Sequence, residues 1–265
     1  MNCLAVDCTC ARLDFQHMPA SHRCLILRTL FVSLLLGGAS VAQCTTRWLQ
    51  GDIELQGDVF ASTLWDPDGV GPLAERLVVG GNFQSLAIGN LHNLAMAEVT
   101  TLDWSSSGDL GLGANSHVFA LSTMPNGDLV VGGIFSTIAG TSLSQIGRYD
   151  GTTWSGFGSG LGGGCNAFAF MPNGDMIAGG SFSTAGGQSA SRIARWNGAA
   201  WSPLGSGFNN IVHSLAVLPN GDLIAGGEFT FSGSTAISRL ARWNGSSWSQ
   251  YAGGAGATVY ALQAT

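Results

Sequence analysis

Three histidines outside the N-terminal segment are the first residues to test for catalysis or metal binding: His92, His117 and His213. The chain contains a repeat of 47 residues, described below. A ring of metal ligands contributed by successive repeats would need histidines at one repeat position. At an offset of 47, His117 aligns with Gly164 and His213 aligns with Asn166. The histidines share no position, so we expect each to be an isolated loop or strand-end residue.

Glu228 is the acidic residue that departs from the repeat, because Ser181 and Ile134 occupy the corresponding positions. Acid–base hydrolysis of a glycosidic bond ordinarily uses a pair of carboxylates. The repeat pattern gives Glu228 no carboxylate partner, so we expect no catalytic pair there.

Asp66 and Asp68 open a segment that resembles a calcium-binding loop. An EF-hand loop needs Asp or Asn at its fifth position and Glu at its twelfth, and these positions hold Val70 and Leu77. Asp, Pro and Gly are also the usual turn residues. We therefore expect a turn rather than a calcium site.

Two charged positions recur in every regular repeat. A repeated Asp beside a turn is expected to accept hydrogen bonds from nearby backbone N–H groups. A repeated Arg beside an aromatic residue is expected to stack on it or to pair with an acid. We expect both sets to be structural. They are Asp128, Asp175 and Asp222, and Arg148, Arg195 and Arg242.

The strands expected to position these residues can be located from a twelve-residue segment that occurs three times in the chain. Its copies (MPNGDLVVGGIF, MPNGDMIAGGSF and LPNGDLIAGGEF) start at Met124, Met171 and Leu218, so the starts lie 47 residues apart. A repeat of about 40 to 50 residues is typical of β-propeller blades, each of which is a sheet of four short strands.

Each repeat is predicted to form four strands, a to d. Two apolar runs, a and b, flank a Pro-Asn-Gly-Asp turn, and Asn-Gly is a strong hairpin signal. Strand b ends in Gly-Gly. About ten looser residues rich in Gly, Ser and Thr follow, then strand c, a second Asn-Gly or Asp-Gly turn, and a Trp that opens strand d. The b–c segments are residues 136–145, 183–191 and 230–238.

The sequence therefore predicts an all-β fold, a β-propeller of about four 47-residue, four-stranded blades. The approximate units are residues 59–111, 118–164, 165–211 and 212–258.

The first unit is degenerate, with a longer a–b connection. Residues 258–262 would begin another strand a, so we expect either four blades with an incomplete fifth or a fragment of a longer array. The exposed edges of an open array would favour self-association. The strands expected in the first unit are a at 59–65, b at 77–83, c at 94–99 and d from Trp104.

Paired aromatic residues recur at one spacing on strands c and d. We expect them to pack between blades, where a large flat side chain buries much area with little loss of rotamer freedom. A carbohydrate-stacking platform is the alternative. The pairs are Tyr149/Trp154, Trp196/Trp201 and Trp243/Trp248.

The repeats resemble the kelch-like propeller repeats of secreted bacterial proteins, a group similar to the delta-60 repeat. The interval between Gly133 and Tyr149 is longer than in kelch repeats, and no Trp-Asp dipeptide ends the units. The resemblance covers about residues 47–265 and implies a propeller and export, but it implies no particular activity. The shared pattern, PNGDLxxGGxF followed by IARWNGxxW, is carried by residues 125–135 with 146–154, 172–182 with 193–201, and 219–229 with 240–248.

Kelch-type copper oxidases are the enzymes to exclude on this resemblance, since their metal is bound by Tyr, Cys and His. The predicted mature chain has only Tyr149, Tyr251 and Tyr260, and neither of its cysteines has a placed partner. The sequence also lacks a G-x-S-x-G elbow, a phosphate-binding loop and zinc-ligand spacing. We therefore expect no enzyme, no cofactor and no metal.

Asn244 begins an Asn-Gly-Ser sequence that matches an N-glycosylation sequon. Because this sequence lies in the repeated c–d turn, we attribute the match to coincidence.

Residues 1–42 have the composition of a signal peptide with an extended leader. Arg28 precedes an apolar run at residues 29–36, and Ser40 and Ala42 are small residues at positions −3 and −1 of a cleavage site. The apolar run is too short to span a membrane, which takes about 20 apolar residues.

Cleavage after residue 42 would make Gln43 the mature N-terminus, whether translation starts at Met1 or at Met18. We expect a secreted, cell-surface or periplasmic protein without a membrane span. Cleavage would leave two cysteines, Cys44 and Cys165.

Cys165 takes the place of Val118 and Val212 at an offset of 47, so we expect a buried thiol. A disulfide between Cys44 and Cys165 is the alternative in an oxidising compartment.

Composition limits the classes of partner. Only 10% of the residues are charged, the net charge is −6, and the ten basic residues are scattered arginines. We therefore expect no nucleic-acid-binding stripe and no polybasic membrane patch.

The combined pattern predicts an exported, non-enzymatic binding or cell-surface scaffold protein. Its partner, a glycan or an envelope protein, would contact the b–c loops, because variable loops on a rigid frame are a common recognition surface. The alternatives are a secreted propeller hydrolase or lyase acting on polysaccharide, and a self-assembling structural repeat protein.

Overall fold

The computed structural model describes residues 56–69, 71, 73–85, 91–99, 111 and 113–264, together with three short strands nearer the N-terminus. The chain divides into two compact units, Met1–Glu54 and Leu55–Thr265.

In the first unit, β1 (Cys3–Asp7) pairs in parallel with β2 (Leu25–Arg28) and antiparallel with β3 (Leu49–Gln50). The predicted cleavage site at Ala42 lies outside the described residues, as do Met18 and Cys44.

Every regular element among the described residues is a β-strand, which confirms the all-β prediction. No helix long and apolar enough to cross a membrane occurs in this described part of the chain.

The three regular repeats of the second unit form antiparallel sheets of four strands each, with strand order a-b-c-d. Tight turns join strands a and b, and Gly127 in the first such turn has a φ of 91°, a conformation that favours glycine. The sheets are β7 (Val118–Thr123), β8 (Leu129–Gly133), β11 (Ile146–Tyr149) and β12 (Trp154–Ser155); β13 (Cys165–Phe170), β14 (Met176–Gly180), β17 (Ile193–Trp196) and β18 (Trp201–Pro203); and β19 (Val212–Val217), β20 (Leu223–Gly227), β23 (Leu240–Trp243) and β24 (Trp248–Gln250).

The preceding sheet has three described strands, β4 (Gln56–Trp65), β5 (Arg76–Ser85) and β6 (Leu91–Glu98). Trp104, predicted to open its fourth strand, lies outside the described residues.

The b–c segments are not loose loops, as the sequence analysis expected, but short hairpins. In the first, Ala139 and Gly140 have φ angles of 50° and 78°, which suit a tight two-residue turn. The hairpins are β9 (Thr137–Ile138) with β10 (Thr141–Ser142), β15 (Thr184–Ala185) with β16 (Gln188–Ser189), and β21 (Phe231–Ser232) with β22 (Thr235–Ala236).

Residues 258–262, predicted to begin another strand a, do not form a strand. A hydrogen bond of 3.2 Å from Val259 N to Gly227 O holds this segment against β20, but no ladder follows.

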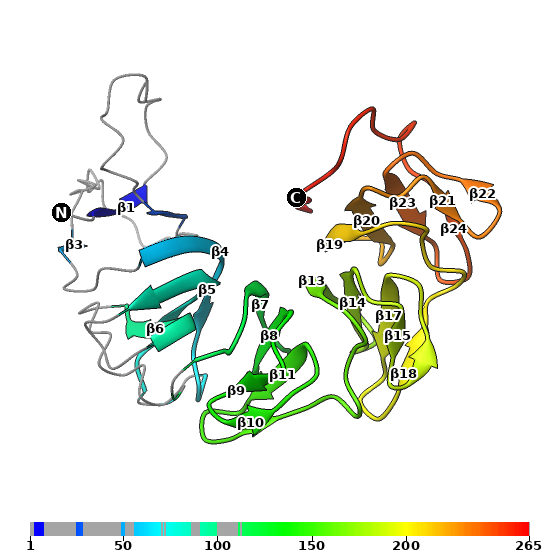
Figure 1. The fold of residues 1–265 in the computed structure, drawn as a ribbon. Coiled ribbons are helices and arrows are strands. Elements are labelled where there is room, and N and C mark those ends of the chain that lie inside the picture. Colours follow the sequence, from blue (N-terminus) through cyan, green and yellow to red (C-terminus); the bar gives the residue numbers. More distant parts are fainter. Residues whose placement is uncertain are drawn as a thin grey trace. The chain divides into compact units, whose positions relative to one another are not determined.

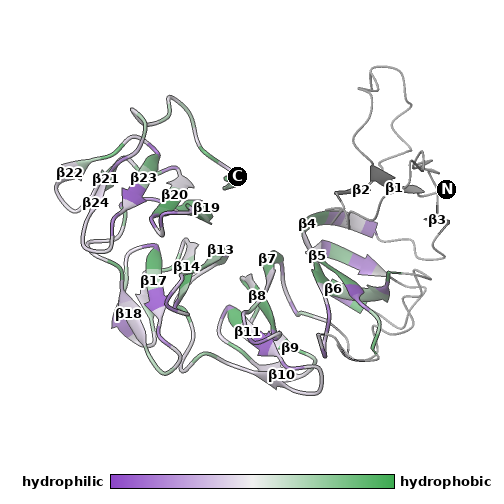
Figure 2. Ribbon diagram, turned by 180° about the vertical axis from the view of Figure 1, so that it is seen from behind, coloured by the Kyte–Doolittle hydropathy of each residue, from purple (hydrophilic) through white to green (hydrophobic). Residues whose placement is uncertain are grey.

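The inner strands β4, β7, β13 and β19 lie next to one another in chain order (Figure 1). Strands β8, β14 and β20 are buried along their whole length, whereas β17 and β23 carry hydrophilic segments (Figure 2). The apolar residues therefore concentrate on the strand next to the inner one.

A side chain from the next repeat packs against the first glycine of each Gly-Gly pair. A Cβ added to Gly179 in β14 would lie 2.6 Å from Val212 Cγ1, closer than real Cβ atoms approach. Glycine at this position therefore lets consecutive inner strands pack closely. The same contact joins Gly80 to Val118, Gly132 to Cys165 and Gly226 to Val259.

The second glycine accommodates a β-bulge in its own sheet. A Cβ on Gly180 would collide with the carbonyl oxygen of Gly164, which accepts the Ser181 N–H at 2.9 Å. The β13–β14 ladder shifts register between Cys165 and Ala167. Equivalent shifts lie between Val59 and Ala61, Val118 and Ala120, and Val212 and Ser214.

Hydrophobic clusters join consecutive sheets; one combines Ile177 of β14 with Leu223 of β20. The buried Trp201 donates Nε1–H to Phe157 O of the preceding repeat at 2.8 Å, and Trp248 donates to Leu204 O at 2.9 Å. The predicted packing of these two d-strand tryptophans between repeats is confirmed.

Gly179→Ala should lower the free energy of unfolding by roughly 1–3 kcal/mol, the usual cost of overpacking. The new Cβ would meet Val212, so the loss should shrink in a Val212→Ala background. Gly256→Ala is the matched control, because a Cβ there meets nothing within 4 Å. Urea unfolding that shows equal stability for the two glycine variants would contradict a packing role for Gly179.

Candidate functional site

The four register shifts leave one bulged residue at the same position of each inner strand. These residues are Phe60 in β4, Phe119 in β7, Asn166 in β13 and His213 in β19. Tyr260 takes the corresponding place after Val259. We call these five residues the bulge row. Bulges commonly re-aim a side chain beside a functional site.

The C-terminal end of the bulge row is polar. His213 Nε2 lies 2.9 Å from Glu228 Oε1, and Asn166 Nδ2 lies 3.4 Å from His213 Nδ1. The Tyr260 ring packs against the imidazole, with centroids 4.9 Å apart. Donation from the Asn166 amide to Nδ1 fits the tautomer in which Nε2–H is donated to Glu228.

One sequence-based expectation is wrong at this point, because His213 is not isolated: it contacts Glu228. The group beside Glu228 is an imidazole and not the second carboxylate that glycosidic acid–base chemistry ordinarily uses. The β19–β20 hairpin causes this: Val212 pairs with Gly227, Glu228 N donates to Ile211 O, and His213 is the bulged residue next to this pair. Both positions depart from the repeat, at Asn166 and at Ser181, and that shared departure is the signal that would have linked them.

The N-terminal end of the bulge row is aromatic. Phe60 and Phe119 have ring centroids 5.7 Å apart, and the His117 ring lies 6.3 Å from Phe60 and 6.0 Å from Phe119. His117 was expected to be isolated, but it belongs to this cluster. Phe60 and the nearby Ile134 are exposed large hydrophobic side chains.

His92 lines a shallow pocket of about 340 Å³ in the first sheet, together with Gln56, Asn82 and Gln84. The pocket wall is held by Asn93, whose Oδ1 accepts from Phe83 N at 3.2 Å and whose Nδ2 donates to Ala114 O at 3.0 Å. Neither His117 nor His213 lines this pocket.

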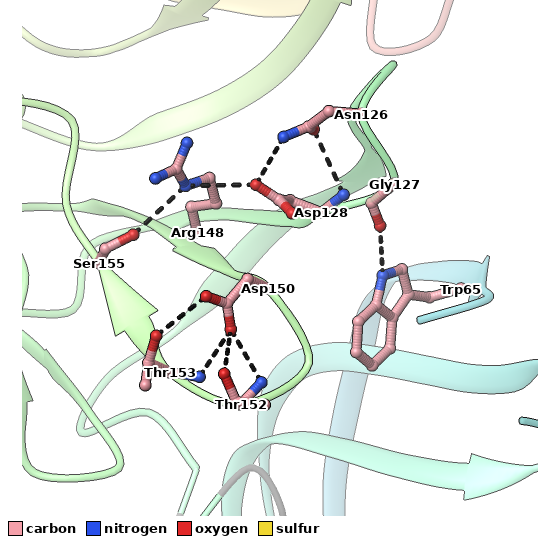
Figure 3. A network of polar contacts seen from close by, with 9 residues as sticks. All are labelled: Trp65, Asn126, Gly127, Asp128, Arg148, Asp150, Thr152, Thr153 and Ser155. Atoms are coloured by element: carbon pink, nitrogen blue, oxygen red, sulfur yellow. Dashed lines mark hydrogen bonds and ion pairs between the residues drawn. The ribbon is translucent and has the colours of Figure 1, made fainter. Parts of the chain in front are cut away.

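The repeated Asp and Arg residues meet within each of the three regular sheets, as Figure 3 shows for Asp128 and Arg148. Asp128 Oδ2 accepts from Asn126 Nδ2 at 2.8 Å and lies 3.4 Å from Arg148 Nε, which also donates to Ser155 Oγ. Backbone N–H donors were expected for the Asp carboxylate, but the Asn amide and the Arg are its partners. The same arrangement joins Asn173, Asp175 and Arg195, and Asn220, Asp222 and Arg242.

Asp150 caps the neighbouring c–d turn (Figure 3). Hydrogen bonds from the backbone N–H groups of Thr153 and Thr152, and from their hydroxyls, hold the pKa of this carboxyl well below its usual range. Asn197 and Asn244 cap the equivalent turns with Oδ1. The sequon asparagine Asn244 thus has a structural role shared with its repeat equivalents.

Asp66 and Asp68 act as turn residues: Asp66 Oδ1 accepts from Asp68 N at 3.2 Å, and Asp68 Oδ2 accepts from Leu73 N at 3.1 Å. Val70 lies outside the described residues. Where side chains are described, no three His, Cys, Asp or Glu residues gather closely enough to hold a metal ion.

Cys165 is a free, fully buried thiol, and its burial raises the pKa of the thiol. Its alternative disulfide partner, Cys44, lies outside the described residues. The prediction of a buried thiol is confirmed. Its sulfur occupies the space beside Gly132 that Val212 fills beside Gly179.

A comparison of the sequence with protein families matches most of the second compact unit. The family described as the Rax2 C-terminal beta propeller domain matches residues 94–264. No curated protein matches the chain.

Among solved structures, the chain is similar to a polysaccharide lyase, an ulvan lyase bound to -[GlcA(1-4)Rha3S]-, at 14% identity and a TM-score of 0.34. The match covers 75% of this chain and only 57% of the lyase. The likeness is too slight to support a conclusion about activity.

Asp175→Ala should lower the free energy of unfolding by roughly 1–3 kcal/mol, because the Asn173 amide loses a charged acceptor that is only 13% exposed. Arg195→Ala should cost about 0–1 kcal/mol, since its side chain is 44% exposed and water screens the ion pair. Urea unfolding measures both; equal losses would mean that the ion pair, rather than the Asn173 bond, dominates.

Proposed function

The chain belongs to the family of Rax2 C-terminal beta propeller domains, and we propose that it is an exported, non-enzymatic binding or cell-surface scaffold protein. In this proposal the four sheets are blades of a kelch-like propeller.

The proposal rests on one observation: the contacts that build the sheets are the same from repeat to repeat, whereas the side chains of the bulge row, at one end of the sheets, differ. The Gly-Gly contacts and the Asp–Arg–Asn contacts recur from repeat to repeat. The bulge row differs at most positions, and it lies where the inner strand begins and strand b ends, immediately before the b–c hairpins. Recognition residues commonly vary on a constant scaffold.

The b–c hairpins are held in place, which supports binding without a large ordering cost. Asn209 Oδ1 accepts from Thr230 N at 2.9 Å and from Phe231 N at 3.0 Å. Asn115 makes the equivalent bonds to Ser136 N and Thr137 N, at 2.9 and 3.0 Å.

A polysaccharide hydrolase or lyase is the second candidate, and the His213–Glu228 pair favours it. A histidine 2.9 Å from a carboxylate is a recognised acid–base arrangement. Hydrolysis by the usual route needs a second carboxylate at the scissile bond, whereas Glu228 faces an imidazole. Binding is therefore the better-supported function.

Export predicts that the mature protein begins at Gln43, because small residues at Ser40 and Ala42 follow the apolar run. N-terminal sequencing of the protein recovered outside the cytoplasm should begin at Gln43. Recovery with Met1 or Met18 retained would contradict cleavage.

The binding face can be tested after a ligand is found by screening glycans and envelope proteins. Replacing residues 183–191 with Gly-Ser should abolish binding, since the β15–β16 hairpin is lost. Asn197→Ala, which alters the c–d turn at the opposite end of the sheet, should leave binding unchanged. Binding that survives the first change and is lost with the second, in folded protein, would place the site on the wrong face.

A further inference from the structure

We propose that the bulge row, with Glu228, is a binding subsite for neutral, hydroxyl-rich oligosaccharides. This inference rests on the proposed binding function and assigns its ligand class and its residues.

The bulge row is free of the packing constraint on its neighbours. The residues just before it, Val118, Cys165 and Val212, are fully buried against glycines of the preceding repeat. The four bulged residues lie outside the strand ladder and are at least partly exposed, and Tyr260 is 69% exposed. The change along the row from Phe to Asn, His and Tyr is therefore not set by the glycine contacts between sheets.

The polar end offers the groups that recognise sugar hydroxyls. The Glu228 side chain is 33% exposed and that of His213 is 17% exposed, so the carboxylate can accept from a ligand while the imidazole holds it in place. Asn166 adds an amide, and Tyr260 presents an aromatic face beside them. A few fixed polar groups next to an aromatic surface are typical of small-ligand sites.

The charge of the site selects among saccharides. Glu228 contributes a carboxylate, and the arginines at this end of the sheets are turned to backbone carbonyls, Arg192 to Phe182 O and Arg239 to Ala255 O, both at 3.4 Å. The described residues place no arginine in contact with Glu228 or the bulge row. A uronate or sulfate group would meet the like charge of Glu228 with no arginine in contact to compensate it, so a neutral sugar is favoured.

The aromatic end extends the site. Phe60 is exposed, and the half-buried His117 and Phe119 pack against it, so the Phe60 ring offers a second surface for stacking of a sugar ring. The row therefore suits an oligosaccharide rather than a monosaccharide.

The test uses the full mature chain and an array of neutral hexasaccharides (cello-, manno- and laminarihexaose) beside oligogalacturonate and sulfated oligosaccharides. We expect a neutral hexasaccharide to bind, and calorimetry to show roughly tenfold weaker binding for Glu228→Gln, His213→Asn and Tyr260→Ala. His213→Asn suits the frame because Asn166 occupies the equivalent position. Asn197→Ala, in the c–d turn at the opposite end of the sheet, is the control and should bind as the native chain does.

Unchanged affinity in the three row variants, preference for an anionic probe, or cleavage of the probe would overturn the inference. If the residue 183–191 replacement abolishes binding while the row variants bind normally, the row is not the site and the binding function stands. Capture of an envelope protein without any saccharide binding overturns the ligand class alone. If neither saccharides nor envelope proteins bind, both proposals fail.

Discussion

The close approach of consecutive inner strands depends on one contact, a side chain of each repeat resting on the first glycine of the pair in the repeat before it. Val212 on Gly179 shows the constraint, since a Cβ at that glycine would lie 2.6 Å from Cγ1. The second glycine makes room for the bulge. One dipeptide therefore sets the spacing between sheets and the irregularity within each sheet.

The bulge is what allows a uniform frame to carry different chemistry. A regular strand alternates its side chains between two faces, and an extra residue breaks that alternation without disturbing the buried positions on either side. Asn166 and His213 occupy such places in successive repeats, so contact between the repeats joins their side chains at 3.4 Å. At the other end of the sheets, an Asp–Arg–Asn contact recurs in each regular repeat, although a different Arg nitrogen faces the carboxylate each time.

Membership of a propeller family describes this frame and leaves the function to the residues placed on it. Three features are not part of the contacts that recur in the frame: the His213–Glu228 pair, the Tyr260 ring beside it and the exposed Phe60. They are compatible with recognition of a sugar and, less readily, with acid–base chemistry.

The sequence by itself determined the all-β class, the strand positions of the regular repeats and the buried state of Cys165, because hairpin turns and apolar runs are local signals that recur at 47 residues. Tertiary structure decided which residues meet. The pairing of His213 with Glu228 required the register of β19 on β20, and the clustering of His117 with Phe60 required two sheets to pack. Neither contact leaves a local pattern, since each joins residues from different strands or different repeats.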